Sequence, residues 1–93
     1  MKIVLKDTFL NRLEEQINYI ATDNPTRARE FKNEVLEKVK AIPRFPYRCR
    51  KSIYFDEENI RDLVFRGFTI VYRITEARIE VFGFVKYKNT PHD

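Results

Sequence analysis

The sequence has one cysteine, one histidine, no tryptophan and only two glycines in 93 residues. The lone Cys49 excludes an internal disulfide, and with a single histidine it leaves too few ligands for a structural zinc site. The apolar runs fall far short of the about 18 residues that a membrane-spanning helix needs. Charges at Lys6 and Asp7 interrupt the N-terminal segment, so it contains no apolar signal-peptide region. We therefore expect a cytoplasmic protein with no metal and no cofactor.

Aromatic and basic side chains, by contrast, are plentiful. Phe and Tyr together make up 14% of the chain, and 43% of the residues are hydrophobic, which suffices for one core at this length. Residues 1–93 are therefore expected to form a single domain. The formal net charge is +4 and the sequence pI is about 9.3. A basic chain of this kind favours a nucleic acid or an acidic protein as its partner.

The first quarter of the chain predicts a strand followed by a helix. Residues 3–5 form a short apolar run, which indicates the strand. Apolar residues then recur at spacings of three and four, as on one face of a helix. Asp7 or Thr8 is expected to cap this helix, because a short oxygen-bearing side chain can accept from the first-turn amides. The apolar face consists of Leu10, Leu13, Ile17 and Ile20.

A second helix is predicted after a break at Asn24 and Pro25. Asn24 suits the N-cap, and Pro25 suits the first helical position, where its missing amide hydrogen costs nothing. Pro43 is expected to stop the helix. The two helices would form an antiparallel hairpin whose apolar face needs a sheet to cover it. The apolar positions of the second helix are Ala28, Phe31, Val35, Val39 and Ile42.

The second half of the chain changes from the helical period to that of strands. Residues 43–50 contain two prolines and predict a loop. Short turns between the later strands imply antiparallel pairing. The expected fold is α+β, with an N-terminal strand and a two-helix hairpin packed on a twisted antiparallel β-sheet, in the order β-α-α-β-β-β-β. The strands after the hairpin are predicted at residues 52–55, 60–66, 68–74 and 79–85.

The most specific pattern in the chain is a pair of strands over residues 61–74. An Arg-x-Leu opens the first strand at Arg61, and an apolar-apolar-Tyr-Arg-apolar run closes the second at Tyr72 and Arg73. With the final strand and the break at Asn24, this pattern resembles the RelE/ParE toxin superfamily of type II toxin–antitoxin systems. The resemblance covers essentially the whole chain.

The resemblance implies a function. Members of the superfamily inhibit growth by binding an essential macromolecule, and a cognate antitoxin neutralises them; such modules are associated with plasmid stabilisation. ParE-like members are associated with poisoning DNA gyrase, whereas RelE-like members cut mRNA on the ribosome without a metal. The antitoxin is expected to place an amphipathic segment in the groove beside the helix hairpin and acidic groups against the arginine-rich loop.

A residue-by-residue check favours the ParE-like branch. RNA-cleaving members commonly carry an Arg three residues before the strand Tyr; here Thr69 precedes Tyr72 and cannot supply a guanidinium. Lys86 stands where many relatives have His or Arg, and an ammonium is a poor general acid near neutral pH. Two alternatives stay open: a non-toxic binding relative, and a metal-independent, ribosome-dependent mRNA endoribonuclease. The catalytic set of such an endoribonuclease would be Arg61, Arg73, Lys86 and Tyr87.

The expected partner-binding surface is basic and lies in the second half of the chain. Residues 44–55 carry four basic groups and no acid. Alternatively, Arg61 and Arg73 pair with acidic side chains on neighbouring strands, and Tyr72 is a packed ring with its hydroxyl satisfied. The candidate partner-binding residues are Arg44, Arg48, Arg50, Lys51, Arg61, Arg66, Arg73, Lys86 and Lys88.

Overall fold

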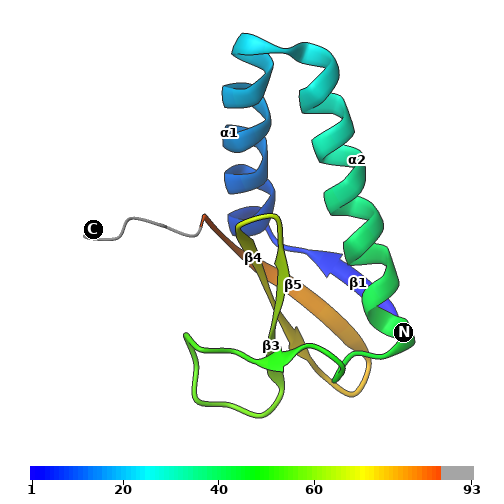
Figure 1. Ribbon diagram of the computed structural model, residues 1–93. Coiled ribbons are helices and arrows are strands. Elements are labelled where there is room, and N and C mark those ends of the chain that lie inside the picture. The colour runs from blue at the N-terminus through cyan, green and yellow to red at the C-terminus, as the bar shows by residue number, and fades with distance from the viewer. Residues whose placement is uncertain (87–93) are drawn as a thin grey trace, which may run out of the picture.

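The computed structural model describes residues 1–86 and shows a strand, two helices and four further strands (Figure 1). The expected α+β class and the order β-α-α-β-β-β-β are confirmed. Within this part of the chain no helix is long and apolar enough to cross a membrane. The elements are β1 (Lys2–Leu5), α1 (Asp7–Asp23), α2 (Pro25–Ala41), the short 3-10 helix η1 (Ile42–Arg44), β2 (Arg50–Lys51), β3 (Ile60–Phe65), β4 (Phe68–Ile74) and β5 (Arg78–Lys86).

The five strands form one mixed sheet in the order β1-β5-β4-β3-β2. The pairs β2–β3, β3–β4 and β4–β5 are antiparallel, as the short turns between the later strands predict. The exception is β1, which runs parallel to β5 with Lys2 opposite Arg78 and Leu5 opposite Val81. The sheet is therefore not wholly antiparallel, because β1 and β5, the first and last strands in the sequence, run parallel to each other.

Of the two predicted helix N-caps, only that of α2 is confirmed. Asn24 is the N-cap of α2, and its Oδ1 accepts from the amide of Arg27 at 3.0 Å, with Pro25 following in the first turn. For α1 the expectation was wrong: the N-cap is Lys6, with no side-chain cap bond. The Thr8 hydroxyl instead donates to the Phe82 carbonyl of β5 at 2.6 Å. The hydroxyl that was expected to cap the helix is thus engaged in a hydrogen bond to a strand distant in sequence.

The strand predicted at residues 52–55 lies earlier in the chain, as β2. Two amides of that segment bind side-chain oxygens in place of a neighbouring strand. The amide of Ile53 donates to Asp62 Oδ2 at 3.0 Å, and that of Tyr54 donates to Ser52 Oγ at 3.1 Å. The Ser52 amide still donates to the Ile60 carbonyl of β3 at 2.9 Å, and the backbone leaves the sheet after it.

The helix hairpin packs on one face of the sheet and encloses an aromatic-rich core. Phe68 of β4 stacks on Phe84 of β5 with ring centroids 5.0 Å apart, and Phe31 of α2 packs on Phe68 at 5.2 Å. The turn between the helices stands clear of the sheet (Figure 1). The sheet therefore leaves the outer end of the hairpin uncovered. The buried core residues are Phe9, Leu13, Phe31, Val35, Val39, Ile42, Phe68, Ile70, Tyr72, Ile74, Ile79, Val81 and Phe84.

Candidate functional site

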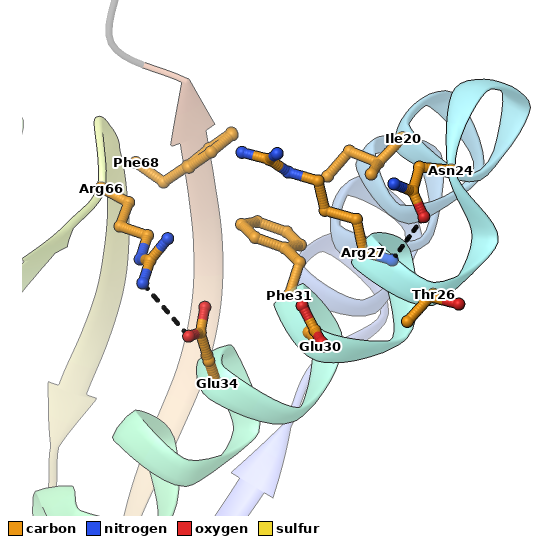
Figure 2. A pocket seen from close by; sticks show the side chains of 9 residues that line it. All are labelled: Ile20, Asn24, Thr26, Arg27, Glu30, Phe31, Glu34, Arg66 and Phe68. Atoms are coloured by element: carbon orange, nitrogen blue, oxygen red, sulfur yellow. Dashed lines mark hydrogen bonds and ion pairs between the residues drawn. The ribbon is translucent and has the colours of Figure 1, made fainter.

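A hollow of about 780 Å³ lies between α2 and the turn that joins β3 to β4 (Figure 2). Its floor is apolar, because the rings of Phe31 and Phe68 meet there, each only 8% exposed. The wall toward the helix turn is polar. The hollow is lined by Ile20, Asn24, Thr26, Arg27, Glu30, Phe31, Glu34, Arg66 and Phe68.

Two arginines stand at the edge of this hollow. Arg66 adopts a left-handed backbone with φ of +51° in the β3–β4 turn, and its guanidinium pairs with Glu34 at 3.2 Å. The side chain of Arg27 extends across the hollow toward Phe68 (Figure 2). No ion pair forms at Arg27 within residues 1–86. The hollow therefore offers an unneutralised cation above an aromatic floor.

A second hollow, of about 300 Å³, adjoins the first on the α1 side and shares Phe68 with it. Tyr19 is 71% exposed here, and the ammonium of Lys86 lies 5.7 Å from the centre of its ring. We call the two hollows together the hairpin groove. Its α1 side is lined by Arg12, Glu15, Gln16, Tyr19, Phe68, Phe84 and Lys86.

Two of the nine predicted partner-binding residues, Arg66 and Lys86, line the hairpin groove. Sequence reasoning missed most of its other members. Ile20 was expected on the apolar face of the first helix, and it is partly buried against the core; its place in the groove follows only from the sheet ending short of the hairpin tip. Arg12 and Arg27 gave no distinctive signal, because a basic residue on a helix surface is usually only solvated.

Arg61 lies elsewhere and is largely buried, with 9% of the residue exposed. Its guanidinium donates to the backbone carbonyls of Glu58 at 3.0 Å and Cys49 at 3.1 Å, and it pairs with the Glu58 carboxylate. The ring of Tyr47 lies 4.9 Å from the guanidinium carbon. Arg61 thus ties the loop before β2 to β3.

Arg73 forms an ion pair on the sheet, as the alternative interpretation anticipated. Its Nη1 lies 3.3 Å from Glu80 Oε1, and Arg78 holds the other carboxylate oxygen of Glu80 at 2.7 Å. The hydrogen bond from Arg78, followed by that from Arg73, lowers the pKa of Glu80 below its ordinary value. Glu80 is therefore ionised at neutral pH and neutralises part of the charge of these two arginines.

The four predicted cations of residues 44–51 fall into two groups. Arg50 pairs with the buried carboxylate of Asp62 at 3.2 Å, and Lys51 pairs with Asp56 at 3.1 Å. Arg44 and Arg48 make no ion pair in the described part of the chain. Arg44 and Arg48 therefore keep their full charge available to a partner, whereas Arg50 and Lys51 do not.

Tyr72 is a packed ring, as the alternative interpretation of this residue held. It is completely buried, and its hydroxyl donates to the carbonyl of Pro46. Burial, and then the neighbouring thiol of Cys49, raises the pKa of Tyr72 well above its ordinary value. The hydroxyl therefore stays protonated at neutral pH and serves to position the loop at Pro46.

The three described members of the proposed nuclease set do not come together. Arg61 lies opposite Tyr72 of β4, whereas Lys86 lies opposite Phe68, four residues or about 13 Å away along that strand, and on the other side of β4 from Arg61. Arg73 follows Tyr72 directly and projects from the other face of the sheet. Tyr87 and Lys88 lie outside the described residues. No single phosphate could contact Arg61, Arg73 and Lys86 in this arrangement.

Comparison with known proteins identifies the family of the chain and solved structures of similar fold. The family model described as "ParE toxin of type II toxin-antitoxin system, parDE" matches residues 3–88. A solved structure described as the chromosomal ParDE TA system from P. aeruginosa aligns with a TM-score of 0.77 at 14% identity, covering 95% of this chain and 97% of that chain. Among curated proteins, a sequence comparison finds no match.

Proposed function

Because the chain belongs to the ParE toxin family of type II toxin–antitoxin systems, we propose that it inhibits growth in the cytoplasm by binding DNA gyrase, and that a cognate antitoxin neutralises it by filling the hairpin groove. The resemblance of the sequence to ParE-like toxins supports gyrase as the target. The observation that carries the antitoxin site is the hairpin groove itself, which combines an aromatic floor with cationic edges.

The shape and charge of the groove suit an amphipathic partner segment. Apolar side chains of the segment would cover Phe68, which both hollows share. Carboxylates that flank this apolar face would meet Arg27 and Lys86 at the edges. A segment that orders only on binding incurs a free-energy cost, which keeps the complex reversible and the free antitoxin sensitive to proteases.

Expression of the chain without an antitoxin tests the toxic activity and its target in one experiment. We expect growth arrest with loss of plasmid supercoiling and intact mRNA. Loss of mRNA with normal supercoiling would overturn the gyrase assignment in favour of RNA cleavage. Normal growth at a high level of folded protein would contradict toxicity altogether and indicate a non-toxic relative.

The antitoxin site is tested separately, with the cognate antitoxin co-expressed and purified. We expect a stable complex whose formation protects the groove residues from hydrogen exchange, with the largest effect on α1 and α2 around the turn between them. Unchanged exchange at the groove in a complex that does form would place the antitoxin elsewhere.

A further inference from the structure

Residues 44–48 form an exposed aromatic and basic surface beyond the C-terminal end of α2. Phe45 is 59% exposed and Tyr47 is 52% exposed, although both are large rings. They line a shallow hollow of about 530 Å³ together with Arg44, Pro46 and Arg48. We call this surface the 44–48 platform. Large rings at this exposure in a small protein call for an explanation.

The platform is held in place by the rest of the fold. The amide of Arg48 donates to the Phe45 carbonyl at 3.0 Å, which closes a tight turn. The buried Tyr72 hydroxyl binds the carbonyl of Pro46, and Arg61 reaches the carbonyl of Tyr47 at 3.5 Å. The rings therefore stay exposed because the backbone is fixed from beneath, and a partner would meet a surface that is already ordered.

The charge of the platform is positive and not neutralised from within. Arg44 and Arg48 have no acidic partner in the described residues, and Arg48 lies with its guanidinium carbon 5.7 Å from the Phe45 ring centre. The next two cations along the chain, Arg50 and Lys51, are already paired with carboxylates. The positive charge at the platform therefore comes from two arginines beside two rings.

We propose that the 44–48 platform binds a protein segment in which an apolar side chain is flanked by carboxylates. Exposed Tyr and Arg at a preorganised site are the composition of an interface hot spot. Carboxylates of the segment would pair with Arg44 and Arg48, and the apolar side chain would rest on the rings. Single-stranded nucleic acid fits less well, because it needs a track of cations along its backbone, and here only two are unpaired.

The platform and the hairpin groove are separate surfaces. The two surfaces share no lining residue, and Glu34, the groove residue of α2 nearest the platform, is 10 positions from Arg44, which corresponds to about 15 Å. A segment confined to the groove therefore leaves the platform open, and the protein can hold two partners at once. This inference goes beyond the proposed function and does not depend on toxicity or on the identity of the target.

The test is a titration of the isotope-labelled full chain followed by NMR. The probe is the peptide acetyl-Glu-Asp-Phe-Glu-Asp-amide, and the matched probe replaces its four acidic residues with lysine. We expect saturable shifts centred on the amides of residues 44–48 with the acidic peptide, weakened by salt. The lysine peptide is expected to bind at least about tenfold more weakly. Absence of a saturable shift at the platform would overturn the proposal.

Matched variants separate specific binding from a general charge effect. We expect Arg44→Glu combined with Arg48→Glu to weaken binding of the acidic peptide at least about tenfold. Arg29→Glu combined with Lys32→Glu makes the same change in net charge on exposed positions of α2 and should leave binding within about twofold. An equal loss of peptide affinity in both double variants would show that the peptide is held by general charge attraction and would contradict the proposal.

A second variant and a competing ligand complete the test. Phe45→Ala keeps both arginines and removes an exposed ring, so the fold should persist while peptide affinity falls about fivefold or more. Unchanged affinity in a folded Phe45→Ala protein would show that the ring does not contribute to peptide binding.

A ten-nucleotide thymidine strand serves as the nucleic-acid probe. Tighter binding of that strand than of the acidic peptide at residues 44–48 would assign the platform to nucleic acid and overturn the proposal.

Discussion

The guanidinium group of Arg61 contacts three residues from two segments of the chain at once. It binds the carbonyls of Cys49 and Glu58 and lies against the ring of Tyr47. An arginine can do this because its donors form a rigid planar fork, which a lysine ammonium lacks. Arg61 contributes to the fold, because its guanidinium donors are bound within the molecule and little of the group is exposed to a partner.

Replacement of Arg61 is therefore expected to act on stability. Arg61→Lys keeps the charge but loses the fork that binds the part-buried carbonyls of Cys49 and Glu58, so we expect a loss of about 1–3 kcal/mol in the free energy of unfolding. Urea denaturation followed by circular dichroism measures this. An Arg61→Lys variant with unchanged stability but impaired partner binding would instead show that Arg61 takes part in binding the partner.

Glu80 gives the molecule a pH dependence with a definite sign. Hydrogen bonds from Arg78 and then Arg73 lower its pKa in the folded protein below the ordinary 4.5. A depressed folded pKa means that the carboxylate stabilises the fold above the unfolded pKa, and that this stabilisation is lost as pH falls through the folded pKa.

We therefore expect the stability difference between the natural protein and Glu80→Gln to be largest at neutral pH and to shrink on acidification. Denaturation midpoints of both proteins between about pH 7 and about pH 2 provide the measurement. A difference that stays constant over this range would show that the ion pairs of Glu80 make no titrating contribution to folding.

At the scale of elements, the β4–β5 pairing contains an irregularity that depends on a glycine. The register shifts between Val71 and Tyr72, so that Gly83 lies opposite Val71 while Val81 lies opposite Tyr72. Phe82 is thus the extra residue of a β-bulge. A Cβ placed on Gly83 would come within 2.9 Å of the Val71 Cβ, so the strands approach too closely there for any side chain.

Gly83→Ala is expected to destabilise the protein by about 1–3 kcal/mol, because the backbone of one strand must move to relieve the overlap. Thermal unfolding of the variant, compared with Val85→Ala on the same strand, provides the measurement. Val85→Ala removes side-chain atoms without adding any, so it should show only the cost of lost packing. A Gly83→Ala protein as stable as the parent would mean that β4 and β5 separate locally without cost.

At the scale of the whole molecule, basic residues far apart in the sequence meet at the hairpin groove. Arg12 of α1, Arg27 of α2 and Lys86 of β5 line its two hollows. They gather there because the helix hairpin folds back over one end of the sheet while its tip extends past it (Figure 1). The net charge of +4 is therefore less informative than where the unpaired cations lie.

Arg12→Glu combined with Arg27→Glu is expected to weaken binding of the cognate antitoxin at least about tenfold, since carboxylates of the partner would then face like charges. Both side chains are exposed, so the fold should persist. Isothermal titration calorimetry with the purified antitoxin measures the affinity, and Arg29→Glu combined with Lys32→Glu is the charge-matched control. Unchanged affinity in the groove variant would exclude these edges from the antitoxin site.

The sequence by itself determined the elements whose signals are local. Helical spacing, the Asn24 cap and the alternation along β3 and β4 each act over a few residues, so α1, α2, β3, β4 and β5 were predictable, as was the family, whereas β2 was misplaced. Even at this range a tertiary contact could intervene, as when Thr8 bonded to Phe82 and left α1 without its expected cap.

Only the tertiary structure decided which charges remain available. Lys2 and Arg78, 76 positions apart, lie opposite each other because β1 pairs with β5, a contact that no local pattern encodes. By the same principle, the donors of Arg61 are bound to backbone carbonyls and to Glu58, whereas Arg44 makes no ion pair in the described chain. An arginine's role depends on the acceptors that the fold brings within hydrogen-bond reach, and those come from residues distant in sequence.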